Sequence, residues 1–230
     1  MPLRIEPVRD RKLHRLIKAA PARAVRKGQV IFRQGDTAGV VHVLDTGHVC
    51  LKLGGAAEPA RTVAVAGPAE LFGEEGMVPG SLRPYSAIAG ERGALVTLDG
   101  STVRAALRTS QHTLTAYLEV KERDLYVLRR AATGSPGASA RERIAVVILD
   151  LVERLGEPDA EGIWLPHWFT HKELADMAGA HRSTVTTCLN DWIWRGVLET
   201  RGRSLVVSGS GLATLRGVGE ARPDPGQGAP

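Results

Sequence analysis

The sequence predicts an α+β fold in three parts: an N-terminal antiparallel β-roll, a long central helix, and a C-terminal domain of helices and a β-hairpin. Three observations support this. Apolar and polar residues alternate between residues 28 and 98, with glycines at short intervals, as in strands joined by turns. Leucines recur at steps of four and three between residues 107 and 128, which is a heptad pattern. Residues 170 to 207 read as two short helices around a glycine, followed by two β-prone runs.

Length and composition suit two small domains. The chain has 230 residues, 43% of them hydrophobic, which is enough for ordinary cores. It has neither an apolar run long enough to span a membrane nor the pattern of a signal peptide, so we expect a cytoplasmic protein with no membrane partner. Cys50 and Cys188 lie in different predicted domains and form no CxxC pair, so they cannot build a structural zinc site or a cysteine-ligated iron–sulfur cluster.

The charge distribution favours an anionic partner but does not make the C-terminal domain basic. The net charge is +5, and residues 1 to 30 hold nine basic and two acidic residues. Residues 139 to 216 hold nine basic and ten acidic residues. Binding of nucleic acid by that domain must therefore depend on cations gathered on one side, for which the candidates are Lys172, Arg182, Arg195, Arg201 and Arg203.

The N-terminal domain, which we assign to residues 1–132, begins with a short amphipathic helix before residue 27. Its basic face is either solvated or a contact for DNA or a partner. Strands follow around Val30, Val41, Val49, and within 62–66, 86–89 and 95–98. The histidine pattern argues against a metal-dependent barrel enzyme, a third class of function, since His42 and His48 are separated and no His-x-His occurs. We expect no enzyme and no metal.

The segment 101–132 is expected to be one helix, capped by Ser101. Its narrow apolar seam predicts a parallel homodimer. Gln111 and Lys121 interrupt the seam, and polar residues there fix register. Lys121 either points to solvent or meets an effector from the partner chain. The seam consists of Leu107, Leu114, Leu118, Leu125 and Leu128.

The remaining boundaries follow from composition. Glycine and proline in 133–139 predict a hinge, and a strongly apolar helix over 140–156 opens a domain that we assign to residues 140–216. An acidic surface turn is expected at 156–162, and a disordered tail at 217–230. The four tryptophans, all between residues 164 and 194, are expected in the core of this domain.

The stretch from residue 170 onward predicts a winged helix-turn-helix. Thr170 and Glu173 form a capping box for a first helix that Gly179 ends. A second helix from about residue 181 to 193 presents short or forked polar side chains, which suit a DNA major groove. The following hairpin carries Arg201 and Arg203 at its tip, where phosphates would lie.

This stretch, Thr-x-x-Glu-Leu-Ala-x-x-Ala-Gly-Ala-x-Arg-x-Thr-Val, resembles the DNA-binding domain of the cyclic-AMP receptor protein and FNR family of bacterial regulators. Two N-terminal motifs, Gly28-Gln-Val-Ile-Phe-Arg-Gln-Gly-Asp and Val43-Leu-Asp-Thr-Gly-His-Val, resemble the start of that family's cyclic-nucleotide-binding domain. The resemblance implies a homodimeric transcription regulator that binds a palindrome with half-sites about 34 Å apart. It also implies contact with RNA polymerase near 156–162.

The resemblance assigns the DNA contacts by position. Arg182 is expected to bind a guanine through two hydrogen bonds, and Ser183 and Thr187 to occupy the other two base-reading positions. The expected phosphate contacts are Thr170, His181, Thr184, Arg201 and Arg203.

The segment from Gly67 to Ala89 resembles the family's phosphate-binding cassette, with one departure. Gly73, Glu74 and Ser86 match, but Tyr85 stands where the family has an arginine, and the nearest guanidinium is that of Arg83. Arg83 either points inward from the same strand face or follows a changed backbone at Pro84.

Three effector outcomes therefore stay open: a cyclic nucleotide, another small anion such as 2-oxoglutarate, or no obligatory ligand, with regulation by the protein's abundance. A small-anion-binding interaction protein that does not bind DNA is the alternative function.

Overall fold

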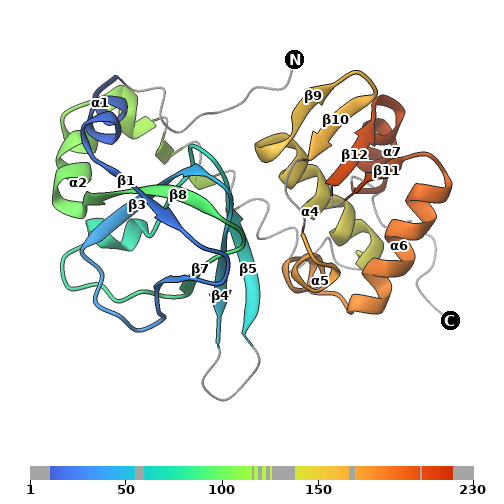
Figure 1. The fold of residues 1–230 in the computed structure, drawn as a ribbon, viewed down its shortest axis with the longest axis horizontal. Coiled ribbons are helices and arrows are strands. Elements are labelled where there is room, and N and C mark those ends of the chain that lie inside the picture. Colours follow the sequence, from blue (N-terminus) through green and yellow to red (C-terminus); the bar gives the residue numbers. More distant parts are fainter. Residues whose placement is uncertain are drawn as a thin grey trace, which may run out of the picture. The chain divides into compact units, whose positions relative to one another are not determined.

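A computed structural model shows the fold (Figure 1). It describes residues 11–54, 60–115, 117–118, 121–122, 125, 138–165, 169–202 and 204–219. These residues form two compact units, one within residues 4–122 and the other within residues 123–230. Each unit has its own core.

The N-terminal unit is the antiparallel β-roll that the sequence predicts, and the α+β fold class is confirmed. Its strands form two four-stranded sheets, in the orders β1-β8-β3-β6 and β2-β7-β4-β5. Strands β1 and β6 were not predicted. The strands are β1 (Ala22–Val25), β2 (Val30–Phe32), β3 (Val40–Thr46), β4 (Val49–Leu53), β5 (Arg61–Ala66), β6 (Leu71–Phe72), β7 (Ser86–Ala89) and β8 (Gly93–Asp99).

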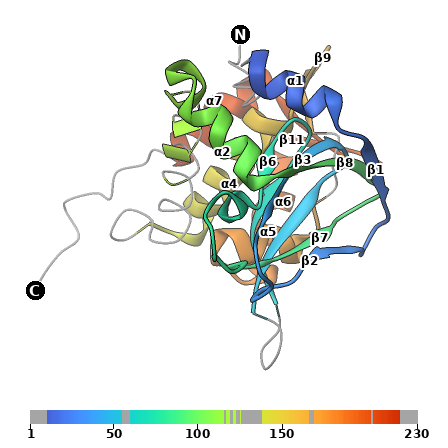
Figure 2. The ribbon, with the colours of Figure 1, turned by 90° about the vertical axis from the view of Figure 1, so that its left-hand side faces the viewer.

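Successive side chains of β3 point to opposite faces of its sheet, so the core of this unit has two layers. Leu44 points between the two sheets, where it meets Phe32, Phe72 and Leu95. Val41 and Val43 point to the opposite side, where helices α1 (Arg11–Ala19) and α2 (Gly100–Arg108) cover the sheet. The two helices lie side by side at one end of the roll (Figure 2). The predicted N-terminal amphipathic helix is therefore a cover for the β-roll.

The prediction of a single helix over 101–132 is wrong in the first part of this segment, where the structure has two successive helices. Asp99, and not Ser101, is the N-cap of α2, since its carboxylate accepts a hydrogen bond from the Thr102 backbone N–H. The helix ends at Arg108, and Ser110 then starts a new one by accepting the N–H of Thr113 at its side-chain oxygen, 3.2 Å away. The expected seam residue Leu107 is consequently buried in the β-roll core, 8% exposed. Leu128 lies outside the described residues.

The C-terminal unit packs its helices against a four-stranded sheet in the order β11-β12-β10-β9. Ser139 and Glu142 form a capping box at its first helix, so Ser139 belongs to a helix terminus and not to a hinge. The other described hinge residue is Ala138, and 133–137 lie outside the described residues. The elements are α4 (Ala140–Leu155), β9 (Glu157–Asp159), β10 (Gly162–Leu165), α5 (His171–Ala178), α6 (Arg182–Trp194), β11 (Leu198–Arg201), β12 (Ser204–Ser208) and α7 (Gly209–Gly219).

Three features of this unit correct the sequence predictions. The acidic segment after Gly156 contains strand β9 and is not only a turn. Helix α7 runs to Gly219, so the disordered tail expected from residue 217 is wrong for residues 217–219, and residues 220–230 lie outside the described residues. Trp192 is fully buried as predicted, but Trp194 is 85% exposed because its position at the end of α6 faces away from the core.

Candidate DNA-binding and effector sites

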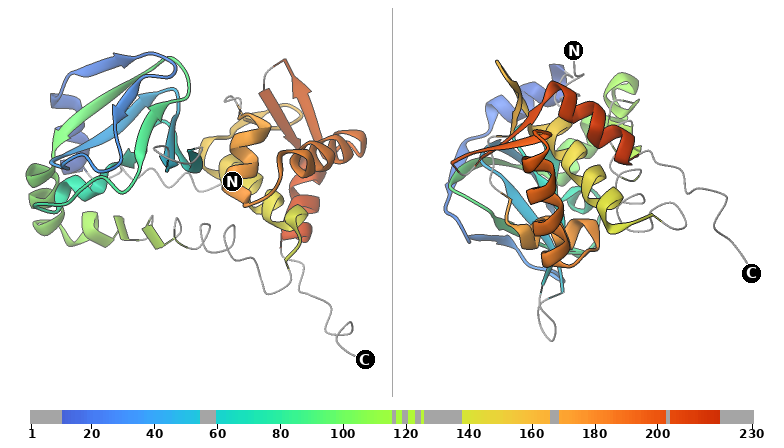
Figure 3. Two further views of the ribbon diagram at one scale, coloured as in Figure 1. Left: turned by 90° about the horizontal axis from the view of Figure 1, so that it is seen from below. Right: turned by 90° about the vertical axis from the view of Figure 1, so that its right-hand side faces the viewer.

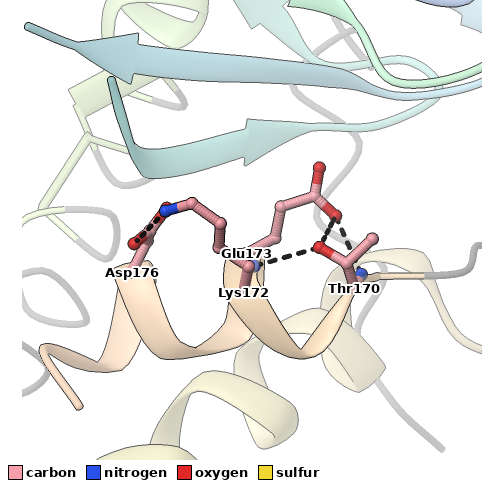
Figure 4. A network of polar contacts seen from close by, with 4 residues as sticks. All are labelled: Thr170, Lys172, Glu173 and Asp176. Atoms are coloured by element: carbon pink, nitrogen blue, oxygen red, sulfur yellow. Dashed lines mark hydrogen bonds and ion pairs between the residues drawn. The ribbon is translucent and has the colours of Figure 1, made fainter. Parts of the chain in front are cut away.

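The first helix of the helix-turn-helix begins and ends as the sequence predicts. The Thr170 hydroxyl accepts the backbone N–H of Glu173 at 3.1 Å, and the Glu173 carboxylate accepts the backbone N–H of Thr170 at 2.8 Å (Figure 4). At the other end Gly179 adopts φ 57°, a left-handed conformation that favours glycine. The chain can therefore turn sharply from α5 into α6.

Arg143 of α4 holds that turn in place. Its guanidinium donates hydrogen bonds to the carbonyl oxygens of Ala178 and Gly179, at 2.8 and 2.9 Å. These are carbonyls that a helix end leaves without partners inside the helix. A third hydrogen bond, of 2.9 Å, goes to the Ala138 carbonyl just before α4. Arg143 thus fixes the start of α6 relative to α4, a role that nothing in the sequence pattern had suggested.

Helix α6 is amphipathic as predicted. Its inner face buries Val185, Cys188, Leu189 and Trp192 against the core. Near its end Asp191 accepts hydrogen bonds from Arg141 and Arg195, and these two bonds, the former more strongly, hold the pKa of Asp191 below its usual value. Both ends of α6 are therefore attached to the unit.

The outer face of α6 carries the three expected base-reading residues. Arg182, Ser183 and Thr187 are all exposed. The Thr187 hydroxyl donates to the Ser183 carbonyl at 3.1 Å, which leaves its methyl and oxygen at the helix surface. Thr186 on the neighbouring row is instead held by His171 of α5, with 2.8 Å between the hydroxyl and Nδ1.

The cations near this face differ in their partners. Lys172 pairs with Asp176 at 3.1 Å (Figure 4), and Arg195 pairs with Asp191 at 2.8 Å. Arg201 binds carboxylates of a different hairpin. Within the described part of the chain, Arg182 alone among the four described candidate cations has no acidic partner. Arg203 lies outside the described residues.

The expected phosphate contacts that the structure describes lie at two helix N-termini, within α6 and in the β11–β12 hairpin. Thr170 and His181 are exposed at the N-termini of α5 and α6, where backbone N–H groups and helix dipoles favour anions. Thr184 is half-buried one turn into α6. Arg201 lies in the hairpin of β11 and β12, which projects from the helices (Figure 3). Its side chain is engaged by acidic residues of the protein itself.

In the β-roll, Arg83 points inward, but not from the strand itself, because the backbone bends at Pro84 and Tyr85 before β7 begins. It is only 3% exposed and lies before β7, on a segment whose backbone bonds to that of Asp36. Its guanidinium donates to the Gly73 carbonyl and to the Glu75 carboxylate, both at 2.9 Å, and to the Val40 carbonyl at 2.7 Å. The protein itself therefore supplies the anion and two of the acceptors that Arg83 requires.

Gly73 is fitted closely against Arg83. Its φ is 75°, and a Cβ at this position would lie 2.7 Å from Arg83 Nη1, so a larger residue would strain the backbone and force the Arg83 guanidinium to shift. The neighbouring Glu74 forms an ion pair of 2.5 Å with Lys121. Lys121 thus neither extends freely into solvent nor requires a partner chain to find an anion. Its binding to Glu74 occupies a carboxylate that was expected in the effector pocket.

Tyr85 and Ser86 complete the cassette. Tyr85 packs on Phe32, with ring centroids 5.9 Å apart, and its burial, aided by the charges of Glu74 and Glu75, raises the pKa of its phenol well above the usual value. The Ser86 hydroxyl accepts the backbone N–H of Gln34 at 2.9 Å. The five predicted pocket residues therefore lie in or beside one cluster, with their polar atoms engaged mainly by the protein.

His42 lies in the same interior. Its ring stacks against Phe32 and Phe72, at centroid distances of 5.7 and 5.2 Å, and these two rings are 6.3 Å from each other. Burial, and then the nearby charges of Arg83 and Arg23, lower its pKa to about 4. Nδ1 lies 3.1 Å from the Thr97 hydroxyl. The histidine is therefore a neutral, hydrogen-bonded core residue, and among the described residues no three candidate ligands converge to hold a metal ion.

Beyond Ser110 the chain exposes an apolar row. Leu114, Leu118 and Leu125 are 40%, 55% and 50% exposed, and they fall at spacings of four and seven residues. These are the expected seam positions that remain once Leu107 is assigned to the β-roll core and Leu128 is set aside.

Nothing among the described helices has the length and apolarity needed to cross a membrane.

Comparisons with known proteins agree with both units. Residues 22–110 match the cyclic nucleotide-binding domain family, and residues 142–215 match the Crp-like helix-turn-helix domain family. The cyclic AMP receptor protein of Thermus thermophilus is 32% identical over 181 residues, covering 75% of this chain and 77% of its own. A CRP-like cAMP-activated global transcriptional regulator of Mycobacterium tuberculosis is 25% identical over 186 residues, covering 80% and 82%.

Solved structures show the same fold. FixK2 from Bradyrhizobium japonicum has a TM-score of 0.73 at 18% identity, covering 89% of this chain and 100% of its own. TTHA1359, a regulator of Thermus thermophilus, has a TM-score of 0.64 at 24% identity, covering 88% and 100%.

Proposed function

Because the chain belongs to the CRP/FNR family of DNA-binding transcription regulators, we propose that it acts as a homodimer that reads a palindromic operator mainly through Arg182. Ser183 and Thr187 flank Arg182 on the exposed face of α6 and complete the base-reading set. The backbone N-termini at Thr170 and His181, together with Thr184, contact the phosphates on either side. Contact between the segment 156–162 and RNA polymerase stays a prediction.

The observation that carries this proposal is the unequal pairing of cations around the recognition helix. Lys172, Arg195 and Arg201 each bind a carboxylate of the protein, which offsets part of their charge and competes with a phosphate for their N–H groups. Arg182 is exposed and has no acidic partner in the part of the chain that the structure describes. An arginine on a groove-facing helix with both edges of its guanidinium available can bind guanine O6 and N7 together.

The test replaces Arg182 with alanine and compares a palindrome selected from random duplexes with a scrambled duplex of the same composition. Loss of a bidentate base contact costs about 1–3 kcal/mol, or about 5- to 150-fold in affinity, for the palindrome alone. Arg195→Ala is the matched control, since it removes an exposed arginine of the same region that already binds Asp191. Equal losses on both duplexes would refute a base-reading role for Arg182.

Dimerisation is supported by the exposed leucine row. Leu114, Leu118 and Leu125 present apolar side chains at heptad spacing, and a second copy of the same helix would cover them. Two recognition helices would then meet successive major grooves about 34 Å apart. Dimerisation doubles the number of DNA contacts, which compensates for a DNA-binding domain that is nearly neutral overall.

For the effector, we propose that operator binding requires no cyclic nucleotide. The pairs Arg83–Glu75 and Lys121–Glu74 satisfy within one chain the charges that would otherwise hold a phosphate and a ribose. Control by a small anion is the second candidate, favoured by the match to the cyclic nucleotide-binding domain and by the depth at which Arg83 is buried.

Calorimetry distinguishes the two candidates. Cyclic AMP, cyclic GMP and 2-oxoglutarate are titrated into the protein alone and into its complex with the palindrome. Operator binding that is unchanged by all three supports the ligand-independent regulator. A saturable heat with any of the three, together with a change in operator affinity, supports anion control and overturns our first choice.

A further inference from the structure

The wing arginine Arg201 is bound by acidic residues that belong to a different hairpin. Its Nη1 donates to the Asp159 carboxylate and its Nη2 to the Glu161 carboxylate. A third carboxylate, that of Glu199 on the same strand, lies 3.7 Å from Nε. All three guanidinium nitrogens therefore face carboxylate oxygens.

These contacts connect the two edges of the C-terminal sheet. Arg201 ends β11 and Asp159 ends β9, the first and last strands in the order β11-β12-β10-β9 (Figure 1). Glu161 follows β9 in the turn that leads to β10. The arginine and Asp159 are 37% and 27% exposed, so the pair lies partly out of water, where charge-assisted hydrogen bonds are stronger than at an open surface.

The geometry is the one that an arginine adopts toward DNA. A guanidinium binds two phosphate oxygens through parallel N–H groups, and here two carboxylates take the same donors. An arginine paired in this way has its charge offset by carboxylates, and one N–H on each of Nη1 and Nη2 is already taken. The protein's carboxylates and a DNA phosphate therefore compete for Arg201.

We propose that Asp159 and Glu161 form an autoinhibitory clamp on the wing, by standing in for DNA phosphates at Arg201. In the clamped state the wing adds no phosphate contact, and DNA binding depends on α5, α6 and their N-termini. Opening the clamp releases one cation per subunit to the DNA backbone. This inference rests on the proposed function, since it requires the wing to meet DNA.

The test is the salt dependence of DNA affinity, because each phosphate contact releases condensed counterions. The slope of log K against log salt steepens by about 0.9 per contact, so a dimer with both clamps removed should steepen by about 1.8. The variant is Asp159→Asn with Glu161→Gln, which keeps the size of both side chains and removes their charges. Fluorescence anisotropy of a labelled operator duplex over a salt series gives the slope.

Two further variants separate release of Arg201 from a general gain of positive charge. Glu157→Gln removes one negative charge from β9 without touching Arg201, so it should leave the slope as in wild type. Arg201→Gln alone should also leave the slope unchanged, because the clamped arginine makes no phosphate contact. Added to the charge-removed double variant, Arg201→Gln should return the slope to the wild-type value.

The opposite pattern overturns the clamp. If Arg201→Gln makes the slope shallower by the same amount in both backgrounds, Arg201 already contacts DNA in the wild type. If the double variant and Glu157→Gln change the slope alike, the effect is only one of net charge. Absence of DNA binding by every variant and by the wild type would instead refute the proposed function. Should the double variant lose its thermal unfolding transition, Glu161→Gln alone, at a position 61% exposed, serves with the same expected direction.

Discussion

Protonation of His42 should destabilise the β-roll below neutral pH. The ring is 5% exposed and packs against Phe32 and Phe72, and its pKa is about 4 in the folded protein against 6.5 in a free side chain. Between these values the unfolded chain binds the proton and the folded one does not, so stability falls as the pH falls. The difference between pH 7 and pH 5 comes to about 2 kcal/mol from these two pKa values.

The assay is urea unfolding at pH 7 and pH 5, followed by circular dichroism for the β-roll. All four tryptophans lie between residues 164 and 194, so tryptophan fluorescence in the same samples reports the C-terminal unit and serves as an internal reference. His42→Phe keeps an aromatic ring against Phe32 and Phe72 and cannot be protonated. The wild type should lose about 2 kcal/mol more than this variant. An equal loss in both proteins would show that another group controls the acid sensitivity.

Three further variants test the packing and the pairs described above. Thr170→Ala removes the capping box of α5 and should lower the stability of the C-terminal unit by about 1 kcal/mol in the fluorescence-detected transition, and no shift would mean that the cap is not formed. Arg83→Met leaves Glu75 and two carbonyls without their donor, so the β-roll should lose about 3–5 kcal/mol by circular dichroism, and a stable variant would show that the buried pair is dispensable. Leu118→Glu should shift the protein toward monomer in sedimentation velocity, whereas the same change at the exposed Leu53 should not.

The sequence predicted the elements whose signals are local. The capping box of Thr170 and Glu173, the left-handed Gly179 and the apolar face of α6 all depend on residues within four positions of one another. The alternation of the β-roll strands is equally local. These elements appear in the structure with boundaries that differ by one or two residues.

The wrong predictions concern features that depend on contacts between residues far apart in the sequence or on a competing local cap. The break between α2 and the following helix follows from Ser110, whose side chain caps a new helix in the middle of a continuous heptad. The burial of Leu107 depends on α2 lying against β3 and β8. Strand β9 is polar, and it is a strand only because β10 supplies its hydrogen-bond partners. Tertiary packing decides each of these.

The partner of each cation was the least predictable property of the chain. Lys121 finds Glu74, Arg141 finds Asp191 and Arg201 finds Asp159, and the members of each pair are more than forty positions apart in the sequence. The count of charges correctly indicated a nearly neutral C-terminal domain, but it could not show how that neutrality is distributed. In the structure, most of the described cations near α6 form ion pairs with carboxylates, and Arg182 does not. Base reading by one arginine then follows from the pairing of its neighbours as much as from its own position, and changing an acidic residue such as Asp176 or Asp159 should alter DNA affinity without touching α6.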